Sequence, residues 1–355
     1  MKPKTPERRE FNPEMFVIAR KSRGLTQGKL AERLSMKQSH ISKIEAGVIN
    51  PPENMLEKLP QILEYQDDFF YRNDQCFGIG AAIIYHRMRQ SISSKLLDKI
   101  EAQINVYRMH IARLLRSVDV AECKIHSYDI DEYGGSANIA NTIRASWMLP
   151  SGPIKNLVRA VENAGGIVIP YDFGTRQLDG LSHWIPNLPP LFFINKNIPG
   201  DRFRFSLAHE LGHVLMHTIP RPDMEKEANQ FAEELLMPAR DIAPSLQPLT
   251  LSKLGDLKMY WKVSMASLVY RAESLARVPA HQILYLRRQM GKAGYRMKEP
   301  VDIPREEPAM LSQIIEIYLK ELGFTIPELC KTLSIYENEF MTLYNNKRCH
   351  LTVAN

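Results

Sequence analysis

Cysteine is scarce in this chain, and its few cysteines do not form metal-binding or redox pairs. The 355 residues include only Cys76, Cys123, Cys330 and Cys349, with no C-x-x-C spacing among them. The basic amino terminus is not followed by the apolar segment of a signal peptide. These features argue against a disulfide framework and predict reduced thiols in a cytoplasmic protein.

Long hydrophobic runs are also missing. The longest apolar stretches, such as Gly78–Tyr85, fall far short of the roughly 20 residues that a membrane-spanning helix needs. The sequence therefore predicts no membrane association. With 44% hydrophobic residues, the chain is long enough to form two or three domains that each have a core.

Net charge is small outside the amino-terminal region. Residues 1–60 hold 12 Lys and Arg against 7 Asp and Glu, which gives +5 of the formal charge of +6. Because phosphate neutralisation supplies most nonspecific affinity for nucleic acid, this local excess is consistent with DNA binding by the amino-terminal region.

The most informative motif lies in Arg202–His217, with the sequence RFRFSLAHELGHVLMH. His209 and His213 are four residues apart, so both lie on one helical face and can reach one metal ion. Glu210 projects about a hundred degrees away from His209 and can handle water without being a ligand. The flanks are apolar, and Gly212 permits close approach of another element. The alternative is a buried helix whose histidines are only hydrogen-bonded core residues.

A catalytic zinc ion needs a third protein ligand and an open position for water. The next acidic helix is expected over Glu225–Pro238, EKEANQFAEELLMP. Glu225 is the preferred ligand, and Asn229 lies one turn further on the same face. Glu227 projects about two hundred degrees away from Glu225, but spacing alone leaves it open as the ligand. His217 is the other rival, although three histidines stacked on a straight helix span about 12 Å of rise.

These two segments resemble the ImmA/IrrE family of zinc metallopeptidase-like proteins. The hallmark of that family is a HELGH helix followed by E-x-x-A-N-x-F-A-x-x-L-L-M-P, and both halves occur here. The resemblance extends over roughly residues 138–240. It implies that His209, His213 and Glu225 bind Zn2+, that Glu210 is the general base, and that the substrate is a protein such as a repressor or antitoxin-like regulator.

A second motif, TQGKLAERLSMKQSHISKIEAG, lies within Met15–Tyr71. Its apolar residues fall where two short packed helices need them, and Ser35–Lys37 make a turn of helix-turn-helix length. Thr26 can cap the first helix and Gly47 can end the second. The alternative is a helical interaction module without DNA affinity.

This segment resembles the XRE-type family of phage-repressor-like helix-turn-helix proteins. The matching residues are Arg20, Gly24–Gln27, Leu30–Ala31 and Ile41–Gly47. Ser35 departs from the pattern, because glycine is common at this turn position and a left-handed backbone costs other residues free energy. The resemblance implies binding to double-stranded DNA, and a palindromic site would indicate a homodimer.

The candidate DNA contacts lie mainly at the start and on the exposed face of the second helix. Gln38 can read adenine through two hydrogen bonds, whereas Gln27 and Lys43 are expected at phosphates. Any one of these residues can instead be solvated surface. The complete expected set is Gln27, Lys37, Gln38, Ser39, His40 and Lys43.

The region between the two motifs predicts helices and a small sheet. Ser91–Asp119 has the pattern of a long amphipathic helix that packs in a core, and Ile154–Asn163 is also expected to be helical. GIVIPY and LFFINK are expected strands, and an edge strand beside the active-site helix can bind an extended peptide. His183 and Tyr171 could assist an oxyanion, but core or surface roles are favoured for both.

The carboxyl-terminal region carries weaker signals. Leu251–Arg288 is expected to be helical, and Gly291–Pro308 has linker composition. Met310–Tyr344 predicts another helical module, in which TIPELCKTLSIYENEFMTLY faintly resembles a helix-turn-helix. Its acidic Glu337 and Glu339 argue against a second DNA reader and favour an interaction or packing module. The apolar residues around its turn are Leu329, Leu333, Phe340 and Leu343.

The expected fold is mainly α with a small β-sheet (α+β). Residues 1–72 are expected to form a helix-turn-helix domain, 73–137 a helical connector, 138–290 a zincin-like metallopeptidase domain, and 291–355 a linker with a helical module. The predicted function is DNA-binding transcription regulation coupled to hydrolysis of a peptide bond in a partner regulator. The alternative is a nonproteolytic transcription factor whose metal site is structural or senses a signal.

Overall fold

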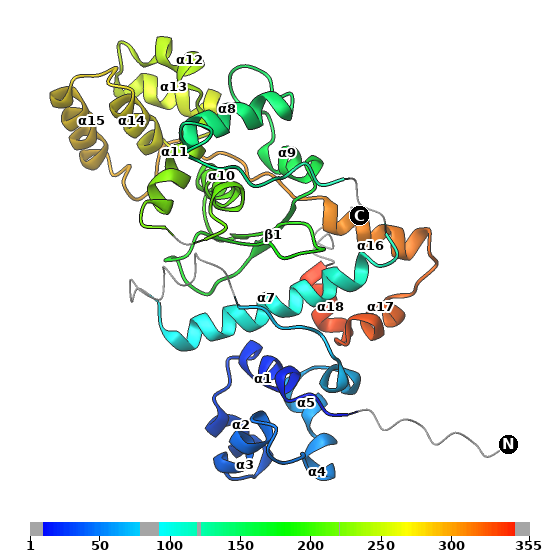
Figure 1. The fold of residues 1–355 in the computed structure, drawn as a ribbon. Coiled ribbons are helices and arrows are strands. Elements are labelled where there is room, and N and C mark those ends of the chain that lie inside the picture. The colour runs from blue at the N-terminus through cyan, green and yellow to red at the C-terminus, as the bar shows by residue number, and fades with distance from the viewer. Residues whose placement is uncertain (1–9, 79–91, 119–121, 220, 345–355) are drawn as a thin grey trace, which may run out of the picture. The chain divides into compact units, whose positions relative to one another are not determined.

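The structure is a computed structural model that describes residues 10–78, 92–118, 122–219 and 221–344. These residues form two compact units, which Figure 1 shows coloured along the chain. The terminal unit contains residues 10–78, 92–118 and 311–344. The central unit contains residues 122–219 and 221–310. Both ends of the sequence therefore contribute to one unit.

Three of the four cysteines lie among the described residues. Cys76, Cys123 and Cys330 are free thiols. Cys349 and most of the Gly78–Tyr85 run lie outside the described residues. No helix formed by the described residues is long and apolar enough to cross a membrane.

The terminal unit begins with five short α-helices and a 3-10 helix. Asn12 and Thr26 cap the first two helices by accepting hydrogen bonds from backbone N–H groups. Ser35 ends the second helix in the left-handed region, with φ of 55°, at the turn position where glycine is common. The elements are α1 (Pro13–Ser22), α2 (Gln27–Leu34), α3 (Gln38–Glu45), α4 (Glu53–Leu56), α5 (Leu59–Leu63) and η1 (Asp67–Tyr71).

The described residues of the terminal unit form four further helices: α7 (Ser94–Leu114), α16 (Met310–Lys320), α17 (Ile326–Leu333) and α18 (Glu337–Tyr344). Helix α7 lies within the predicted Ser91–Asp119 segment and packs against α1 and α17. The backbone N–H of Gln66 donates to the carbonyl oxygen of Ser334 at 3.1 Å. The chain therefore continues in one compact unit past the expected boundary at residue 72, because residues beyond 310 cover the end of the helix-turn-helix region.

The central unit contains nine helical segments among its described residues and a three-stranded sheet. The helices are α8 (Ser136–Ser146), α9 (Leu157–Asn163), α10 (Gly200–Met216), α11 (Met224–Leu236), α12 (Ala239–Ile242), η2 (Ala243–Leu246), α13 (Leu251–Trp261), α14 (Met265–Ser274) and α15 (Ala280–Lys292). The strands are β1 (Ile167–Tyr171), β2 (Gly180–His183) and β3 (Leu191–Asn195). The expected α+β class with a small sheet is confirmed.

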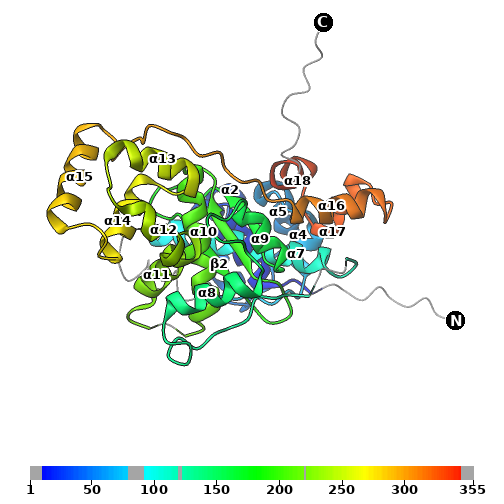
Figure 2. The same ribbon diagram turned by 90° about the horizontal axis from the view of Figure 1, so that it is seen from above.

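The sheet has the order β1-β3-β2, in which β1 pairs with β3 in parallel and β2 pairs with β3 antiparallel. The sequence predicted β1 and β3 but not β2. Helix α10 packs against β2 and β3, and α11 packs against both α10 and α8. Figures 1 and 2 show α11 beside α10 from two directions. The sheet and α11 thus hold α10 between them.

The expected linker Gly291–Pro308 is instead part of the central unit. Glu306 accepts hydrogen bonds from the backbone N–H groups of Leu157 and Val158 at 2.7 and 3.0 Å, so it caps α9. Glu299 accepts from Lys258 Nζ at 2.6 Å. These carboxylates fix the extended segment, which the sequence composition alone did not reveal.

The predicted helical stretch Leu251–Arg288 is divided into three helices. Lys262 ends α13 in the left-handed region, with φ of 55°. Ser264 then caps α14 by accepting a hydrogen bond from the backbone of Ser267. Pro279 precedes α15. Similarly, α9 begins three residues after Ile154, because Asn156 caps it.

Candidate metal centre and DNA-reading helix

Helix α10 is the platform of the candidate metal centre. Its apolar residues, including Leu207, Leu211 and Leu215, are fully buried. A Cβ atom added to Gly212 would lie 3.1 Å from a ring carbon of Phe231 and 3.3 Å from the Cα of Ala228. Glycine at this position therefore lets α11 approach closely enough to bring its own side chains to the histidines.

The metal cluster consists of His209, His213 and Glu225, one ligand atom from each lying within 4.8 Å of the others. The Nε2 atoms of His209 and His213 are 3.0 Å apart. One oxygen of Glu225 lies 3.5 Å from Nε2 of His209, and the other lies 3.4 Å from Nε2 of His213. The three expected ligands are thus brought together by α10 and α11.

The two carboxylate–imidazole separations of 3.4 and 3.5 Å fit zinc, and the 3.0 Å between the two Nε2 atoms is slightly shorter than the ideal separation. Ligand atoms about 2.0–2.2 Å from a tetrahedral zinc ion lie roughly 3.2–3.6 Å from one another. Two imidazoles and one carboxylate leave a fourth position open, which is the donor set of a catalytic site. The Nε2 atoms of His209 and His213 face each other, and each can offer a lone pair. Two lone pairs repel at this distance unless a cation lies between them.

The outer nitrogens of both histidines have fixed partners. Nδ1 of His209 lies 3.0 Å from Oδ1 of Asn229, which can only accept, so the Nδ1–H donates and Nε2 is left with its lone pair. On the other side, Nδ1 of His213 lies 2.9 Å from Nδ1 of His217, and Nε2 of His217 lies 3.0 Å from Oε2 of Glu227. The rivals His217 and Glu227 therefore form a hydrogen-bonded chain behind His213, outside the metal cluster.

The electrostatics of the His209, His213 and Glu225 side chains follow from this convergence. Burial alone would raise the pKa of Glu225, but the hydrogen bonds and charges of His209 and His213 hold it well below the usual range. Burial would lower the pKa of His209, and the partners Glu225, Glu210 and Asn229 instead raise it. Burial and the neighbouring His213 lower the pKa of His217 to about 4. The cluster thus favours positive charge at its centre.

Glu210 lies beside the metal cluster and is buried against β2. Ser182 Oγ donates a hydrogen bond to Oε2 of Glu210 at 2.8 Å. A Cβ atom added to Gly180 would lie only 2.9 Å from Cγ of Glu210 and 3.3 Å from its Oε1. The glycine and the serine of β2 therefore fix the position of this carboxylate.

Sequence reasoning missed Ser182 and the role of Gly180, because it did not predict β2. The segment that contains them, Leu178–Trp184, lies within the range of the family resemblance, which assigned no role to it. A glycine two residues before a serine, in a stretch that matches the family, was the available signal. Neither residue type alone indicates contact with Glu210, which lies 28 residues after Ser182.

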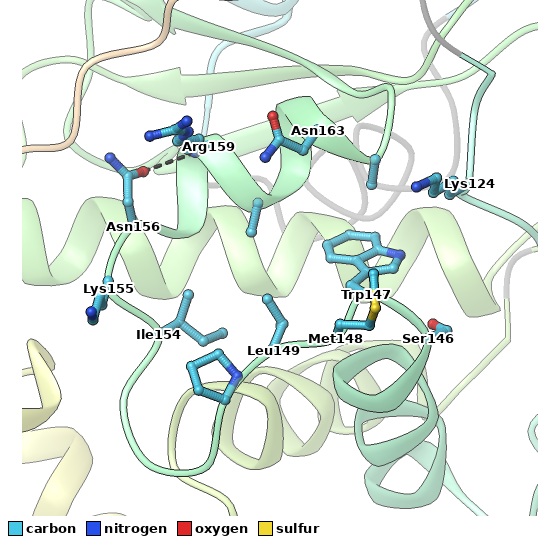
Figure 3. A pocket seen from close by; sticks show the side chains of 13 residues that line it. Lys124, Ser146, Trp147, Met148, Leu149, Ile154, Lys155, Asn156, Arg159 and Asn163 are labelled. Carbon is cyan, nitrogen blue, oxygen red and sulfur yellow. Dashed lines mark hydrogen bonds between the residues drawn. The ribbon is translucent and has the colours of Figure 1, made fainter.

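The two proposed oxyanion residues lie in the core. Tyr171 is buried and packs edge-on against Phe173 and Phe193 at ring distances of 4.8 and 5.8 Å. His183 is buried at the end of β2. A separate pocket of about 410 Å³ lies between α9 and the end of α8 (Figure 3), lined by residues such as Trp147, Leu149 and Arg159. No residue of the metal cluster lines it.

Helix α3 of the terminal unit presents the candidate DNA contacts. Lys37, Gln38, Ser39, His40 and Lys43 are all exposed, and they occupy the start of α3 and its outer face. The opposite face is buried through Ile41 and Ile44. The structure thus leaves five of the six expected DNA contacts open to a ligand.

Gln27, the sixth expected contact, is only partly exposed and has an internal partner. Its Nε2 donates to Oε2 of Glu45 at 2.7 Å. Arg20, which is buried, donates to the same carboxylate through Nε at 2.5 Å and Nη2 at 3.0 Å. This network ties α1 and α2 to the end of α3, so that the three helices present α3 as one body.

The central unit therefore has the fold and converging side chains of a metallopeptidase-like domain, and the terminal unit begins with a helix-turn-helix DNA-binding domain. Comparison with known families agrees. Residues 162–273 match the model of the IrrE N-terminal-like domain, and residues 18–70 match a helix-turn-helix model. The predicted combination of an XRE-type domain with an ImmA/IrrE-like domain is thus confirmed. No curated protein matches the chain.

Proposed function

We propose that the protein is a cytoplasmic transcription regulator whose central unit hydrolyses a peptide bond in a partner protein, such as a repressor or antitoxin-like regulator. The observation that supports this proposal is the position of Glu210. Its carboxylate is next to the metal cluster but is not one of the three converging ligands, and Ser182 holds it there. A metal site that only stabilises the fold does not require such a carboxylate.

Each residue has a distinct role in this proposal. His209, His213 and Glu225 would hold Zn2+, which would supply Lewis-acid chemistry by polarising a carbonyl group and lowering the pKa of water. Oε1 of Glu210 takes a proton from the attacking water and returns it to the amine leaving group. Ser182 keeps the other carboxylate oxygen in place, so that Oε1 is the atom available for this transfer.

Strand β2 is the proposed binding edge for the substrate backbone. It lies at one edge of the sheet order and also carries the residues that contact Glu210. An extended peptide that adds to this edge would be aligned by backbone hydrogen bonds. This arrangement favours an unfolded or flexible segment of the partner protein as the cleaved region.

The terminal unit supplies the DNA-directed part of the function. The exposed face of α3 is proposed to enter the major groove, where Gln38 and His40 approach base edges and Lys37 and Lys43 approach phosphates. Regulation then combines occupancy of a DNA site with cleavage of a partner. Either half alone would also change transcription, so an experiment must separate them.

The separating experiment replaces the chromosomal gene with one that encodes Glu210→Gln, and uses Glu132→Gln, an exposed glutamate of the central unit, as the control. Amino-terminal peptides and transcripts are then profiled in each strain. We expect Glu210→Gln to keep its zinc and its DNA sites, yet to lose a cleavage product of a regulator and the dependent transcriptional response. Normal regulation by Glu210→Gln would instead support the nonproteolytic transcription factor.

A further inference from the structure

The three helices at the carboxyl end of the terminal unit repeat the three at its amino end with a constant offset of 299 residues. Helix α17 spans Ile326–Leu333, which are the positions equivalent to Gln27–Leu34 of α2. Helix α18 spans Glu337–Tyr344, which are the positions equivalent to Gln38–Glu45 of α3. Helix α16 precedes them as α1 precedes α2 and α3.

The turns between these helices repeat their unusual backbone angles. Gly24 and Gly323 have φ of 66° and 71°, and Ser35 and Ser334 have φ of 55° and 59°. Left-handed residues at two matching positions are rare by chance, particularly when one is a serine. The hydrogen bonds that close the second turn also match: Ser35 N to Glu32 O and Met36 N to Ala31 O, against Ser334 N to Lys331 O and Ile335 N to Cys330 O.

The caps and the core repeat as well. Thr26 and Thr325 both cap their helices by accepting a hydrogen bond from the backbone N–H three residues later. The buried side chains occupy equivalent positions, so the same face of each helix forms the core. The buried pairs are Met15 and Ile314, Phe16 and Ile315, Leu30 and Leu329, Leu34 and Leu333, and Ile41 and Phe340.

The outward faces of α3 and of its equivalent, α18, differ in charge. Where α3 carries Gln38, His40 and Lys43, α18 carries Glu337, Glu339 and Thr342. An acidic face repels phosphate, so α18 is unsuited to DNA. Moreover, the Glu339 side chain is only 17% exposed, because it forms an ion pair with Arg23 at 2.6 Å.

The two turns also have different surroundings. Ser35 is exposed, whereas Ser334 is fully buried. The carbonyl oxygen of Ser334 accepts from Gln66 N at 3.1 Å, and its Oγ donates to Asp68 Oδ2 at 3.0 Å. Nε2 of Gln66 donates to the carbonyl oxygen of Ile335 at 2.7 Å. The second turn therefore contacts the polypeptide that follows α5.

We propose that residues 310–344 are a second helix-turn-helix unit that binds protein in place of DNA. Its partner is the first helix-turn-helix unit of the same chain, at Arg23 and at residues 65–72. This contact uses the turn between α17 and α18 and the acidic face of α18. In a helix-turn-helix unit that reads DNA, the same parts would approach the DNA. Each chain then presents one DNA-reading helix, α3, although it contains two helix-turn-helix units.

The first test compares the thermal unfolding of the full chain carrying Glu339→Arg or Glu337→Arg. Both place the same cation on α18, but only position 339 faces Arg23. We expect Glu339→Arg to lower the midpoint of unfolding by at least about 3 °C relative to Glu337→Arg, as loss of roughly 1 kcal/mol implies. The milder Glu339→Gln should fall between them. Equal midpoints for the three variants would overturn the proposed contact.

The second test measures binding to a DNA duplex that the full wild-type chain selects from a random-sequence pool. We expect the triple variant Glu337→Ala, Asn338→Ala, Thr342→Ala to bind within about two-fold of wild type. The equivalent variant Gln38→Ala, Ser39→Ala, Lys43→Ala should lose at least ten-fold, roughly one good base contact. A comparable loss from the α18 variant would overturn the proposal.

This second test rests on the proposed DNA binding, whereas the thermal test does not. Failure of the wild-type chain to select any duplex would therefore count against the proposed function. The unfolding midpoints of the Glu339 and Glu337 variants would still decide whether the second unit is bound to the first.

Discussion

The metal cluster and the face of α3 are both small groups of polar side chains on short stretches of helix, but their surroundings differ. His209 and His213 are fixed through both ring nitrogens, by partners 2.9–3.5 Å away. Gln38 and His40 are exposed on α3. A metal site requires convergence inside the protein, whereas a DNA-reading face requires an open surface whose partner is another molecule.

The convergent metal cluster and the open face of α3 restrict their ligands to different degrees. Convergent ligand atoms restrict the chemistry, so a few distances are sufficient to mark His209, His213 and Glu225 as a candidate metal site. An exposed helix face restricts only the groove and the orientation, because bases are read by side chains that order on binding. Substitutions should therefore have large, local effects in the central unit and smaller, sequence-dependent effects on α3.

The largest expected effect is loss of zinc from His213→Ala. Removing one of three ligands should weaken zinc binding by more than the 10- to 100-fold that is typical for a supporting residue, with no change in DNA affinity, since α3 belongs to the other unit. Competition with a chelator and fluorescence anisotropy measure the two affinities. His126→Ala, an exposed histidine of the central unit, is the control and should keep its zinc. Equal zinc affinity in both variants would contradict the assignment.

A smaller effect is expected from Glu227→Gln than from Glu225→Gln. Glu227 acts on the ion only through His217 and His213, so we expect zinc affinity to fall by about 10- to 100-fold. Glu225 faces both Nε2 atoms directly, and its variant should lose more. The same chelator competition ranks the two. The reverse order would make Glu227 the ligand, the alternative that the sequence left open.

On α3, specificity and affinity should separate. Lys43→Ala should weaken binding to all sequences similarly and reduce the slope of log affinity against log salt by about 1. Replacing Gln38 and His40 with alanine should change the preferred bases, at a cost of about 1–3 kcal/mol on the selected site. Affinity of the full chain for selected and scrambled duplexes, over a range of salt, distinguishes them. Identical behaviour of both variants would mean that α3 does not read bases.

The smallest expected effect comes from Ser35→Gly. Ser35 is exposed and has a left-handed backbone, so glycine should raise the free energy of unfolding of the terminal unit by about 0.5–1 kcal/mol. Ser39→Gly is a matched control inside α3, where glycine should lower it by a similar amount. Chemical denaturation of the full chain measures both. Destabilisation by Ser35→Gly would show that the serine side chain has a structural role at this turn.

Much of this architecture follows from local patterns in the sequence. The four-residue spacing of His209 and His213 requires only a helix to place both imidazoles on one face, and α10 provides it. Thr26 and the apolar residues of α2 and α3 likewise define the helix-turn-helix, including the turn at Ser35. These features depend on neighbours within one or two helical turns, which a sequence pattern records directly.

The features that the sequence did not reveal depend on distant partners. Strand β2 is four residues long, and its contact with Glu210 arises only when the sheet packs on α10. Glu299 and Glu306 convert an apparent linker into a packed segment because they meet buried cations and helix ends far away in the chain. The contact of Ser334 with Gln66 joins opposite ends of the sequence. Composition and periodicity carry no information about such pairings.

X-ray absorption at the zinc edge of the purified full chain tests the assignment of the metal centre most directly. We expect about one zinc ion per chain, with four or five nitrogen and oxygen neighbours at about 2.0–2.2 Å and the multiple scattering of two imidazoles. The imidazole signal should fall in His213→Ala and persist in His126→Ala. A chain that binds no zinc, or a zinc ion with sulfur neighbours at about 2.3 Å, would contradict the site formed by His209, His213 and Glu225.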